Sequence, residues 1–366
     1  MPLTFKNFYK TTKTFTISRE EKSNMSSWWT YSDDAAWLTA GSTDFDEFFW
    51  YYGCRLSDTW LETDKVEQSS WWILDITQLW DLTTWDNVMI AFPRRWIKMS
   101  KSWSIITLSI TSEPNKDWYQ YYAHTKGNDD KNTLYLWAYK MVSWYKSLSW
   151  VKPLSNSRSS IRSWVKSTYD SSAWTNRYSQ ITIYPRWFIC ALYMMKYGNP
   201  KSQSVIWKWY IWWSSTVNTW WTNNQTSASY WTSSNTSQIK LFWLEDFRWN
   251  IFEWIDGNLY NSSTQLTVDK TNSIYQDSDY ATNLWAPANW WIAAIEWTND
   301  GMFKNTSTSW WSSTEYYTDV FDTYKWRAIV AWGKFNGMND REWIFYFSQA
   351  WAADNWEWYG ARLMYL

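Results

Sequence analysis

The stretch LFWLEDFRWNIFEWIDG, from Leu241 to Gly257, holds three tryptophans, four carboxylates and an asparagine, and it decides how the rest of the chain is interpreted. The whole chain has 40 Trp and only 9 Gly. Ordinary usage of about 7% would give roughly 26 glycines. Many tryptophans lie among Ser, Thr and Asn, where turns take glycine because it reaches positive φ without steric cost. We interpret Trp243, Trp249 and most other tryptophans as glycine positions, in a gene whose reassigned stop codon, read as glycine in some uncultivated bacteria, has been translated as tryptophan.

With glycine at 243 and 249, the stretch becomes LFGLEDFRGNIFEWIDG and resembles the G-L-x-D-x-x-G-N-x-x-E-W signature of the C-type-lectin-like superfamily. That superfamily contains formylglycine-generating enzymes, phage tail proteins and the variable proteins of diversity-generating retroelements. The acids could also be proposed as a carboxylate or calcium site, but their spacing matches no calcium loop. The resemblance implies instead a structural motif that locks strand to loop, made by Glu245, Asp246, Asn250, Glu253, Trp254, Gly360 and Arg362.

Length and charge narrow the class of protein. A chain of 366 residues can bury a large core, as one large domain or two ordinary ones. A net charge of −1 gives no electrostatic basis for binding nucleic acid or an anionic membrane. The sequence has no run of about 18 apolar residues and no apolar signal-peptide core at its start. We therefore expect no nucleic-acid partner, no membrane insertion and no export by the ordinary route.

Composition divides the chain into three parts. Residues 1–30 are polar and basic and are expected to be a lead or tether. Residues 31–130 form a β-rich portion, in which 86–95 (DNVMIAFPRR) and 104–111 (SIITLSIT) are typical of strands. The resemblance places a C-type-lectin-like domain over 131–366, in one unit with the β-rich portion. The expected fold is α+β, a loop-rich mixed β-sheet with two helices.

The two helices are expected at 159–166 and 178–197, where apolar residues recur at helical spacing. Pro185 is an alternative start for the second helix, since proline is favoured at the first helical position. The segments 222–240 and 258–320 are dense in Ser, Thr and Asn. Such composition predicts long surface loops.

The sequence offers little for catalysis or metal binding. His124 is the only histidine and lies in YYAHTKGNDD, which is typical of a solvated turn. Cys54 and Cys190 are far apart in sequence, so no zinc spacing exists, and both are expected to be small buried residues. Formylglycine-generating relatives need a cysteine pair in the C-terminal half of the fold, and no cysteine follows Cys190. We predict no catalytic residue, no metal and no cofactor.

The segment from Ala328 to Leu366 resembles the family's ending, in which G-G-x-W-x-x-G precedes an A-G-x-F strand and the chain closes on G-A-R-L. Trp332 and Trp343 take glycine places, and Phe345 matches as written. In diversified members this segment is the exposed ligand face, since one side of a strand holds the core while the other is free to vary. The implied ligand-binding residues are Lys334, Phe335, Asn336, Asn339, Asp340, Arg341, Tyr346, Ser348, Ala350, Asp354, Asn355, Glu357 and Tyr359. Their mixture resembles a paratope, although an ordinary polar surface has a similar composition.

These inferences predict a non-enzymatic binding protein, either a receptor-binding tail protein of a phage or prophage or a retroelement variable protein. The expected ligand is a cell-surface protein or glycan, and the expected location is a virion tail or the cell surface. The resemblance also implies a homo-oligomer such as a trimer, or assembly into a tail or particle. Two alternatives stay open: an enzyme related to sulfatase-modifying factors, and a literally tryptophan-rich protein that stacks sugars on its indoles.

Overall fold

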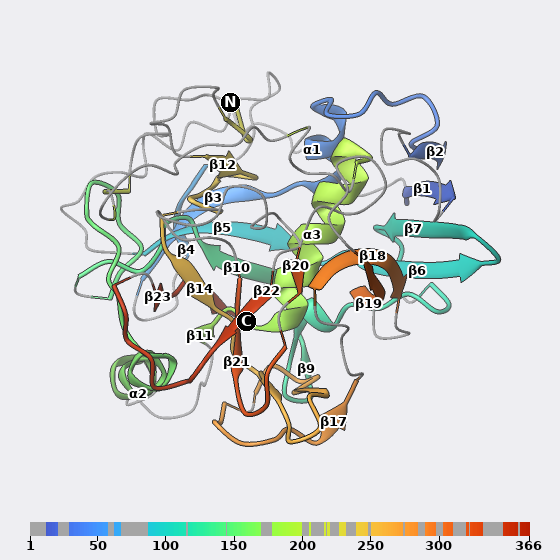
Figure 1. Cartoon of the computed structure of the whole chain (residues 1–366). Coiled ribbons are helices and arrows are strands. Elements are labelled where there is room, and N and C mark those ends of the chain that lie inside the picture. Colours follow the sequence, from blue (N-terminus) through green and yellow to red (C-terminus); the bar gives the residue numbers. More distant parts are fainter. Residues whose placement is uncertain are drawn as a thin grey trace, which may run out of the picture.

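The computed structural model describes residues 12–20, 29–57, 62–66, 87–114, 116–143, 145–169, 178–199, 205, 216, 218–219, 227–231, 239–247, 250–273, 275–284, 290–297, 303–309, 320–321, 323–331, 347–357 and 359–366. Within them the protein is a strand-rich α+β fold, which confirms the predicted class (Figure 1). Its α-helices in this part of the chain are α1 (Asp44–Phe49), α2 (Arg158–Tyr169) and α3 (Ile183–Tyr197). None of these described helices is long and apolar enough to cross a membrane.

A six-stranded sheet joins distant parts of the sequence. Its order is β11 (Tyr178–Gln180), β24 (Leu363–Tyr365), β10 (Thr133–Trp137), β5 (Asn87–Pro93), β3 (Tyr52–Leu56) and β4 (Glu62–Val66). β5 confirms the strand predicted over 86–95 and carries the buried run from Val88 to Phe92. Because β10 pairs with β5 on one side and β24 on the other, residues on both sides of position 130 share one sheet.

A four-stranded antiparallel sheet has the order β2 (Thr30–Asp33), β1 (Thr14–Glu20), β7 (Ile105–Thr111) and β6 (Trp96–Ser102). β7 confirms the second predicted strand. The predicted tether is wrong over β1, because alternate residues Phe15 and Ile17 enter the core and the Phe15 ring stacks on Phe48 at 3.8 Å. The rest of 1–30, apart from 12–13 and 29, lies outside the described residues.

Helix α3 lies between the two sheets in the middle of the molecule (Figure 1) and all fifteen of its residues are buried. The helix predicted over 159–166 is confirmed as α2. The second helix begins later than 178, since residues 178–180 form β11 and pair with the C-terminal strand β24. Pro185 lies in the first turn of α3, where its missing N–H costs no hydrogen bond. Cys54 and Cys190 are free and buried, as predicted.

The predicted surface loop over 258–320 is wrong over much of its length. A three-stranded sheet contains β15 (Asn258–Tyr260), β16 (Leu266–Val268) and β17 (Thr282–Asn283). A seven-stranded mixed sheet has the order β19 (Phe303–Ser309), β18 (Trp290–Trp297), β20 (Val320–Phe321), β22 (Phe347–Ala350), β21 (Ala328–Ala331), β14 (Phe252–Trp254) and β23 (Tyr359–Gly360). Threonine and buried Leu or Val suit a pleated strand, so high Ser and Thr content alone was misleading here.

Two short hairpins complete the described strands. One pairs β8 (Thr125–Lys126) with β9 (Asp129–Asp130), directly after the 3₁₀ helix η3 (Tyr122–His124). The other pairs β12 (Lys240–Leu241) with β13 (Leu244–Glu245) and belongs to the signature stretch. Of the predicted loop 222–240, residues 222–226 and 232–238 lie outside the described part of the chain.

Many tryptophans have the backbone of glycine. Thirteen described non-glycine residues have positive φ, and six are tryptophans: Trp50, Trp103, Trp118, Trp150, Trp243 and Trp326. A left-handed residue with a Cβ costs about 1–2 kcal/mol. Trp254 does not have positive φ and, as predicted, it is buried, with its indole N–H donating to the Asn156 carbonyl at 2.9 Å. Trp220, Trp221, Trp310 and Trp311, expected in exposed turns, lie outside the described residues.

Candidate functional site

The predicted structural motif gathers around the guanidinium of Arg362, which is fully buried. Its Nε donates to Glu253 Oε1 at 2.9 Å, and its Nη2 donates to the Glu245 carbonyl at 2.6 Å. Its Nη1 donates to the carbonyls of Trp137 and Ala138. A buried charge is tolerated when it is paired and fully hydrogen-bonded. Arg362 therefore ties the chain's closing segment to the signature stretch and to β10.

Asp246 and Asn250 shape the turn between β13 and β14. Both have positive φ, 51° for Asp246 and 70° for Asn250, a conformation that short Asn and Asp side chains tolerate. The Asn250 side-chain amide donates to Asp246 Oδ2 at 2.8 Å, and both residues are buried. The two buried polar side chains are therefore hydrogen-bonded to each other, as expected in a structural turn.

Gly360 has a steric reason to be glycine. A Cβ atom there would lie 2.2 Å from Cδ1 of Ile251 and 2.9 Å from the Leu154 carbonyl oxygen. Its strand β23 runs parallel to β14, with Gly360 opposite Glu253. The close approach of these two backbones brings Arg362 within reach of its carboxylate partner.

Lys140 completes this buried cluster. Burial lowers the pKa of its ammonium to about 8, against the opposing attraction of Glu253 and Asp246. Its Nζ donates to the Ile251 carbonyl. Lys140, Glu253 and Arg362 are each 0% exposed, so no substrate can reach these charges. The cluster holds the fold together and offers no catalytic surface.

A second ion-pair cluster, absent from the sequence expectations, links α2 to the turn between β14 and β15 at Asp256 and to the segment before β17 at Asp277. Arg162 binds Asp256 through two hydrogen bonds of 3.0 and 2.8 Å, and Arg158 Nη2 donates to Asp277 Oδ1 at 2.8 Å. Burial raises the pKa of Asp277, but Arg158 and Arg162 outweigh it and hold that pKa below its usual range.

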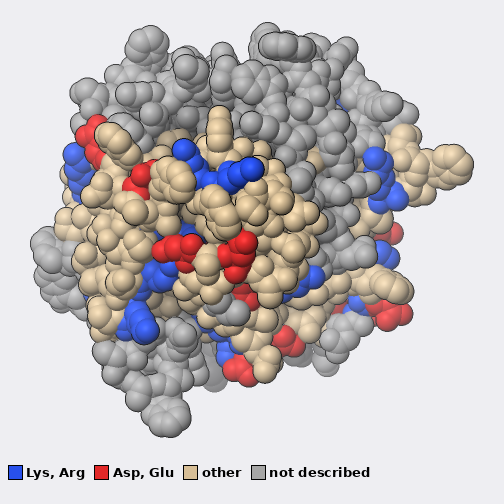
Figure 2. All heavy atoms as spheres, turned by 60° about the horizontal axis from the view of Figure 1, so that its bottom comes forward, with Lys and Arg blue, Asp and Glu red and all other residues tan. Residues whose placement is uncertain are grey.

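On the face at the bottom of Figure 1, acidic and basic side chains are interspersed, with no large area of one charge sign (Figure 2).

The predicted ligand face is described only in its second half. Lys334, Phe335, Asn336, Asn339, Asp340, Arg341 and Tyr346 lie outside the described residues, as do Trp332, Trp343 and Phe345. Ser348 is half-buried in β22. Ala350 does not belong on a free face, because it is 1% exposed and pairs with Ala328 in the interior of the sheet. Phe347 and Ala350 project to opposite faces of β22 and both are buried, so simple alternation fails here.

The loop after β22 does present predicted residues. Asn355 and Glu357 are exposed and Asp354 is partly exposed, with Asp354 Oδ2 accepting a hydrogen bond from the Trp351 N–H at 3.0 Å. Ser155, just before α2, holds the loop by donating to the Glu357 carbonyl at 2.5 Å. We call residues 351–357 the C-terminal loop.

Tyr359 was predicted to contact ligand, yet it packs inward. Its ring lies 4.9 Å from Trp254 and 5.7 Å from Phe252, measured between ring centroids, and it is only half-buried. The strand pairing of Tyr359 with Phe252 sets this direction. Tyr359 therefore packs against strand β14 and helps to fix the end of the C-terminal loop.

Beside the C-terminal loop stand residues that sequence reasoning missed. Arg327 lies with its guanidinium 4.9 Å from the Trp351 ring centroid and 5.3 Å from that of Tyr324. Tyr324, Trp326, Trp351 and Trp356 are large exposed aromatic residues, 48–58% exposed. Of these, Tyr324 does not depend on how the tryptophan positions are read, and an exposed tyrosine beside an arginine is typical of recognition surfaces. The signal was present in YKWR at 324–327, just upstream of the segment that resembles the family's ending.

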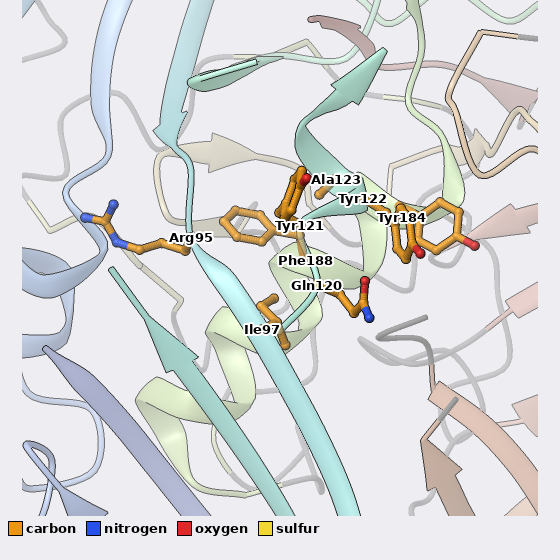
Figure 3. A pocket seen from close by; sticks show the side chains of 8 residues that line it. All are labelled: Arg95, Ile97, Gln120, Tyr121, Tyr122, Ala123, Tyr184 and Phe188. Carbon is orange, nitrogen blue, oxygen red and sulfur yellow. The ribbon is translucent and has the colours of Figure 1, made fainter. Parts of the chain in front are cut away.

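A small open recess lies elsewhere, between η3, the start of β6 and α3 (Figure 3). Its lining residues are Arg95, Ile97, Gln120, Tyr121, Tyr122, Ala123, Tyr184 and Phe188. His124 is buried next to it and not solvated as expected. Its ring packs edge-on against Phe188, Nε2 lies 3.1 Å from the Phe92 carbonyl oxygen, and burial lowers its pKa to about 3.

Comparison with models of known protein families finds no match, and the curated proteins contain no significant match to this chain.

Proposed function

We propose that the chain is a non-enzymatic binding protein of the C-type-lectin-like superfamily, and that it presents its ligand-recognition face on the C-terminal loop and the adjoining turn at Tyr324–Arg327. The proposed setting is a phage or prophage tail, or the variable protein of a diversity-generating retroelement. The proposed ligand is a cell-surface protein or glycan.

One observation carries the proposal: an exposed loop is held between two deeply buried framework strands. Asn355 and Glu357 are exposed, while Phe347 before them and Ala361 to Leu363 after them are buried. Arg362 fixes the second of these ends through its hydrogen bonds to Glu253 and three carbonyls. Recognition surfaces are commonly loops positioned by a rigid scaffold.

Two observations weigh against the alternatives. The only two cysteines are Cys54 and Cys190, both buried, which does not suit a formylglycine-generating oxidase. The described positive-φ tryptophans occupy glycine-like backbone in separate turns, which does not suit a tryptophan surface selected for sugar stacking.

The test is a binding screen of the full chain on intact bacterial cells and a glycan array. We expect the variant Tyr324→Ala/Arg327→Ala/Glu357→Ala to lose binding at least tenfold, since hot-spot side chains contribute about 2 kcal/mol or more each. Its melting temperature should stay close to that of the parent. The matched control Ser262→Ala/Ser263→Ala changes an exposed turn between β15 and β16 and should bind normally.

The half of the predicted face that lies outside the described residues is tested by a separate variant. Phe335→Ala/Tyr346→Ala removes the two predicted aromatic anchors and should weaken binding by a comparable factor. Tyr359→Ala should instead lower stability, because its ring packs on Trp254. Full binding by both face variants would refute a C-terminal recognition face.

A further inference from the structure

The recess of Figure 3 has an uncharged floor. Ile97, Ala123, Tyr184 and Phe188 are each less than 10% exposed, and they bring two rings and two aliphatic groups together. The neutral His124 packs behind Phe188 and adds no charge, because burial lowers its pKa to about 3. Such a floor favours an apolar group over an ion.

Arg95 lines the recess without bringing its charge into it. Its Nε and Nη2 donate to the Phe48 carbonyl at 3.2 and 2.9 Å, and its Nη1 donates to the Arg94 carbonyl at 2.9 Å. Figure 3 shows its side chain directed away from the tyrosines. The aliphatic stem alone therefore faces the recess, and Arg95 offers no charge there to a phosphate or carboxylate.

The rim carries two neutral polar groups that remain available. Within the described part of the chain, neither the Gln120 side-chain amide nor the Tyr122 hydroxyl has a hydrogen-bond partner. Their backbones are nevertheless fixed. Gln120 and Ile97 exchange two hydrogen bonds of 2.7 and 2.8 Å, and the Asn272 side-chain amide donates to the Tyr122 carbonyl at 2.7 Å. A fixed backbone with available side-chain groups is a preorganised arrangement.

Aromatic rings provide the wall. The rings of Tyr122 and Tyr184 lie 5.3 Å apart and tilted by 47°, and Tyr121 stands across from them (Figure 3). Tyrosine combines an apolar ring face with a polar tip. Ligand sites are typically apolar and aromatic with a few placed polar groups, and here those groups are an amide and a hydroxyl.

We propose that this recess binds a neutral acetamido sugar, such as an N-acetylhexosamine unit of a glycan. The methyl of the acetamido group would rest on the floor formed by Ile97, Ala123 and Phe188. The Gln120 amide would pair with the acetamido N–H and carbonyl, and the Tyr122 hydroxyl with a ring hydroxyl. The proposal does not rest on the C-terminal face. No lining residue is tryptophan, so the lining side chains are the same whether the tryptophan positions encode tryptophan or glycine.

The experiment titrates the full chain with a trimer of N-acetylglucosamine and, separately, with cellotriose, which has the same linkage and no acetamido group. Calorimetry should show saturable binding of the acetylated trimer and at least tenfold weaker binding of cellotriose. Gln120→Ala should weaken binding of the acetylated trimer about tenfold, because it removes the groups that pair with the amide. Tyr122→Phe should weaken it severalfold. Tyr119→Phe, a neighbouring tyrosine outside the recess, is the matched control and should bind normally.

Gln120 and Tyr122 are both partly exposed, so these variants should melt at the parent's temperature. Equal affinity for the two trimers, undiminished binding by Gln120→Ala, or no saturable binding by the parent would overturn the proposal. The variant Tyr324→Ala/Arg327→Ala/Glu357→Ala, which is expected to lose the separate ligand of the C-terminal face, should bind the free acetylated trimer normally. Loss of binding by that variant would place the sugar on the C-terminal face and would also overturn it.

Discussion

At the scale of single residues, three turns show how tryptophan occupies glycine places. Helix α3 ends on Gly198 with φ 55°, and α1 ends on Trp50 with φ 51° and the same cap hydrogen bond. The β12–β13 hairpin has two central residues, Phe242 and Trp243, and both have positive φ. Two-residue hairpins of this kind prefer Asn-Gly. Trp103 is the first residue of the two-residue β6–β7 connection, with φ 55° and 94% of its surface exposed.

We predict that Trp103→Gly raises the free energy of unfolding by about 1 kcal/mol, because relief of left-handed strain exceeds the extra backbone entropy lost. Trp254→Gly should lower it by about 3–5 kcal/mol, since that indole is buried and hydrogen-bonded. Urea unfolding of both variants measures the contrast. Destabilisation by Trp103→Gly would contradict the glycine interpretation of that turn.

The nucleotide sequence of the gene provides an independent check of the glycine interpretation. We expect the reassigned stop codon at Trp243, Trp249, Trp332 and most other tryptophans, and the ordinary tryptophan codon at Trp254. The nucleotide sequence decides this directly. Ordinary tryptophan codons throughout would exclude the recoding and favour the literal tryptophan-rich protein.

His124 predicts how stability depends on pH. Burial lowers its pKa in the folded protein to about 3, while its pKa in the unfolded chain is near the ordinary value of 6.5. Between these values the unfolded chain binds a proton that the folded protein does not. The contribution of His124 to stability is therefore fully present above pH 6.5 and falls as the pH falls, by about 2 kcal/mol between pH 7 and pH 5. Urea midpoints across this range measure it. His124 is the only histidine, so His124→Gln should have a much flatter profile, and an unchanged slope would contradict this assignment.

At the scale of elements, the ion pair between Glu253 of β14 and Arg362 of the closing segment predicts that the effects of changing these two residues on stability are strongly coupled. Glu253→Gln leaves the buried Arg362 guanidinium without its counter-charge and should cost about 3–5 kcal/mol of unfolding free energy. Arg362→Met should cost a similar amount. The double variant should lose clearly less than the sum, since contacting residues couple. Strict additivity in a denaturation cycle would show that the two side chains act separately.

At the scale of the whole molecule, the shared six-stranded sheet predicts that the chain cannot be divided at residue 130. A fragment of residues 131–366 would keep β10 and β24 but lose β5, which pairs with β10 from Thr133 to Trp137. Leu134 and Leu136, buried in the full chain, would meet water. We expect this fragment to show no cooperative melting by circular dichroism, and the full chain to melt in one transition. Cooperative melting of the fragment near the parent's temperature would contradict a shared core.

The sequence by itself determined the elements whose signal is local. The apolar run of β5, the alternation of β7 and the helical spacing of α2 each predict a structure that short-range geometry decides. The same holds for Trp254, the one tryptophan of the signature stretch expected to be buried. The α+β class follows from such segments, because their periodicity is a property of the residues themselves.

Tertiary structure decided the outcome wherever pairing between distant segments overrides the local composition. Tyr178–Gln180 is a strand because β24, nearly two hundred residues later, pairs with it. His124 lies in a polar stretch and is buried only because α3 places Phe188 against it. Ala350 has no free side because the folded chain covers β22 on both faces, burying Phe347 on one and Ala350 on the other. The recess around Gln120 and Tyr122 arises from three separate segments. Contacts between such distant residues leave no periodic trace in a single sequence, so only the folded chain could show them.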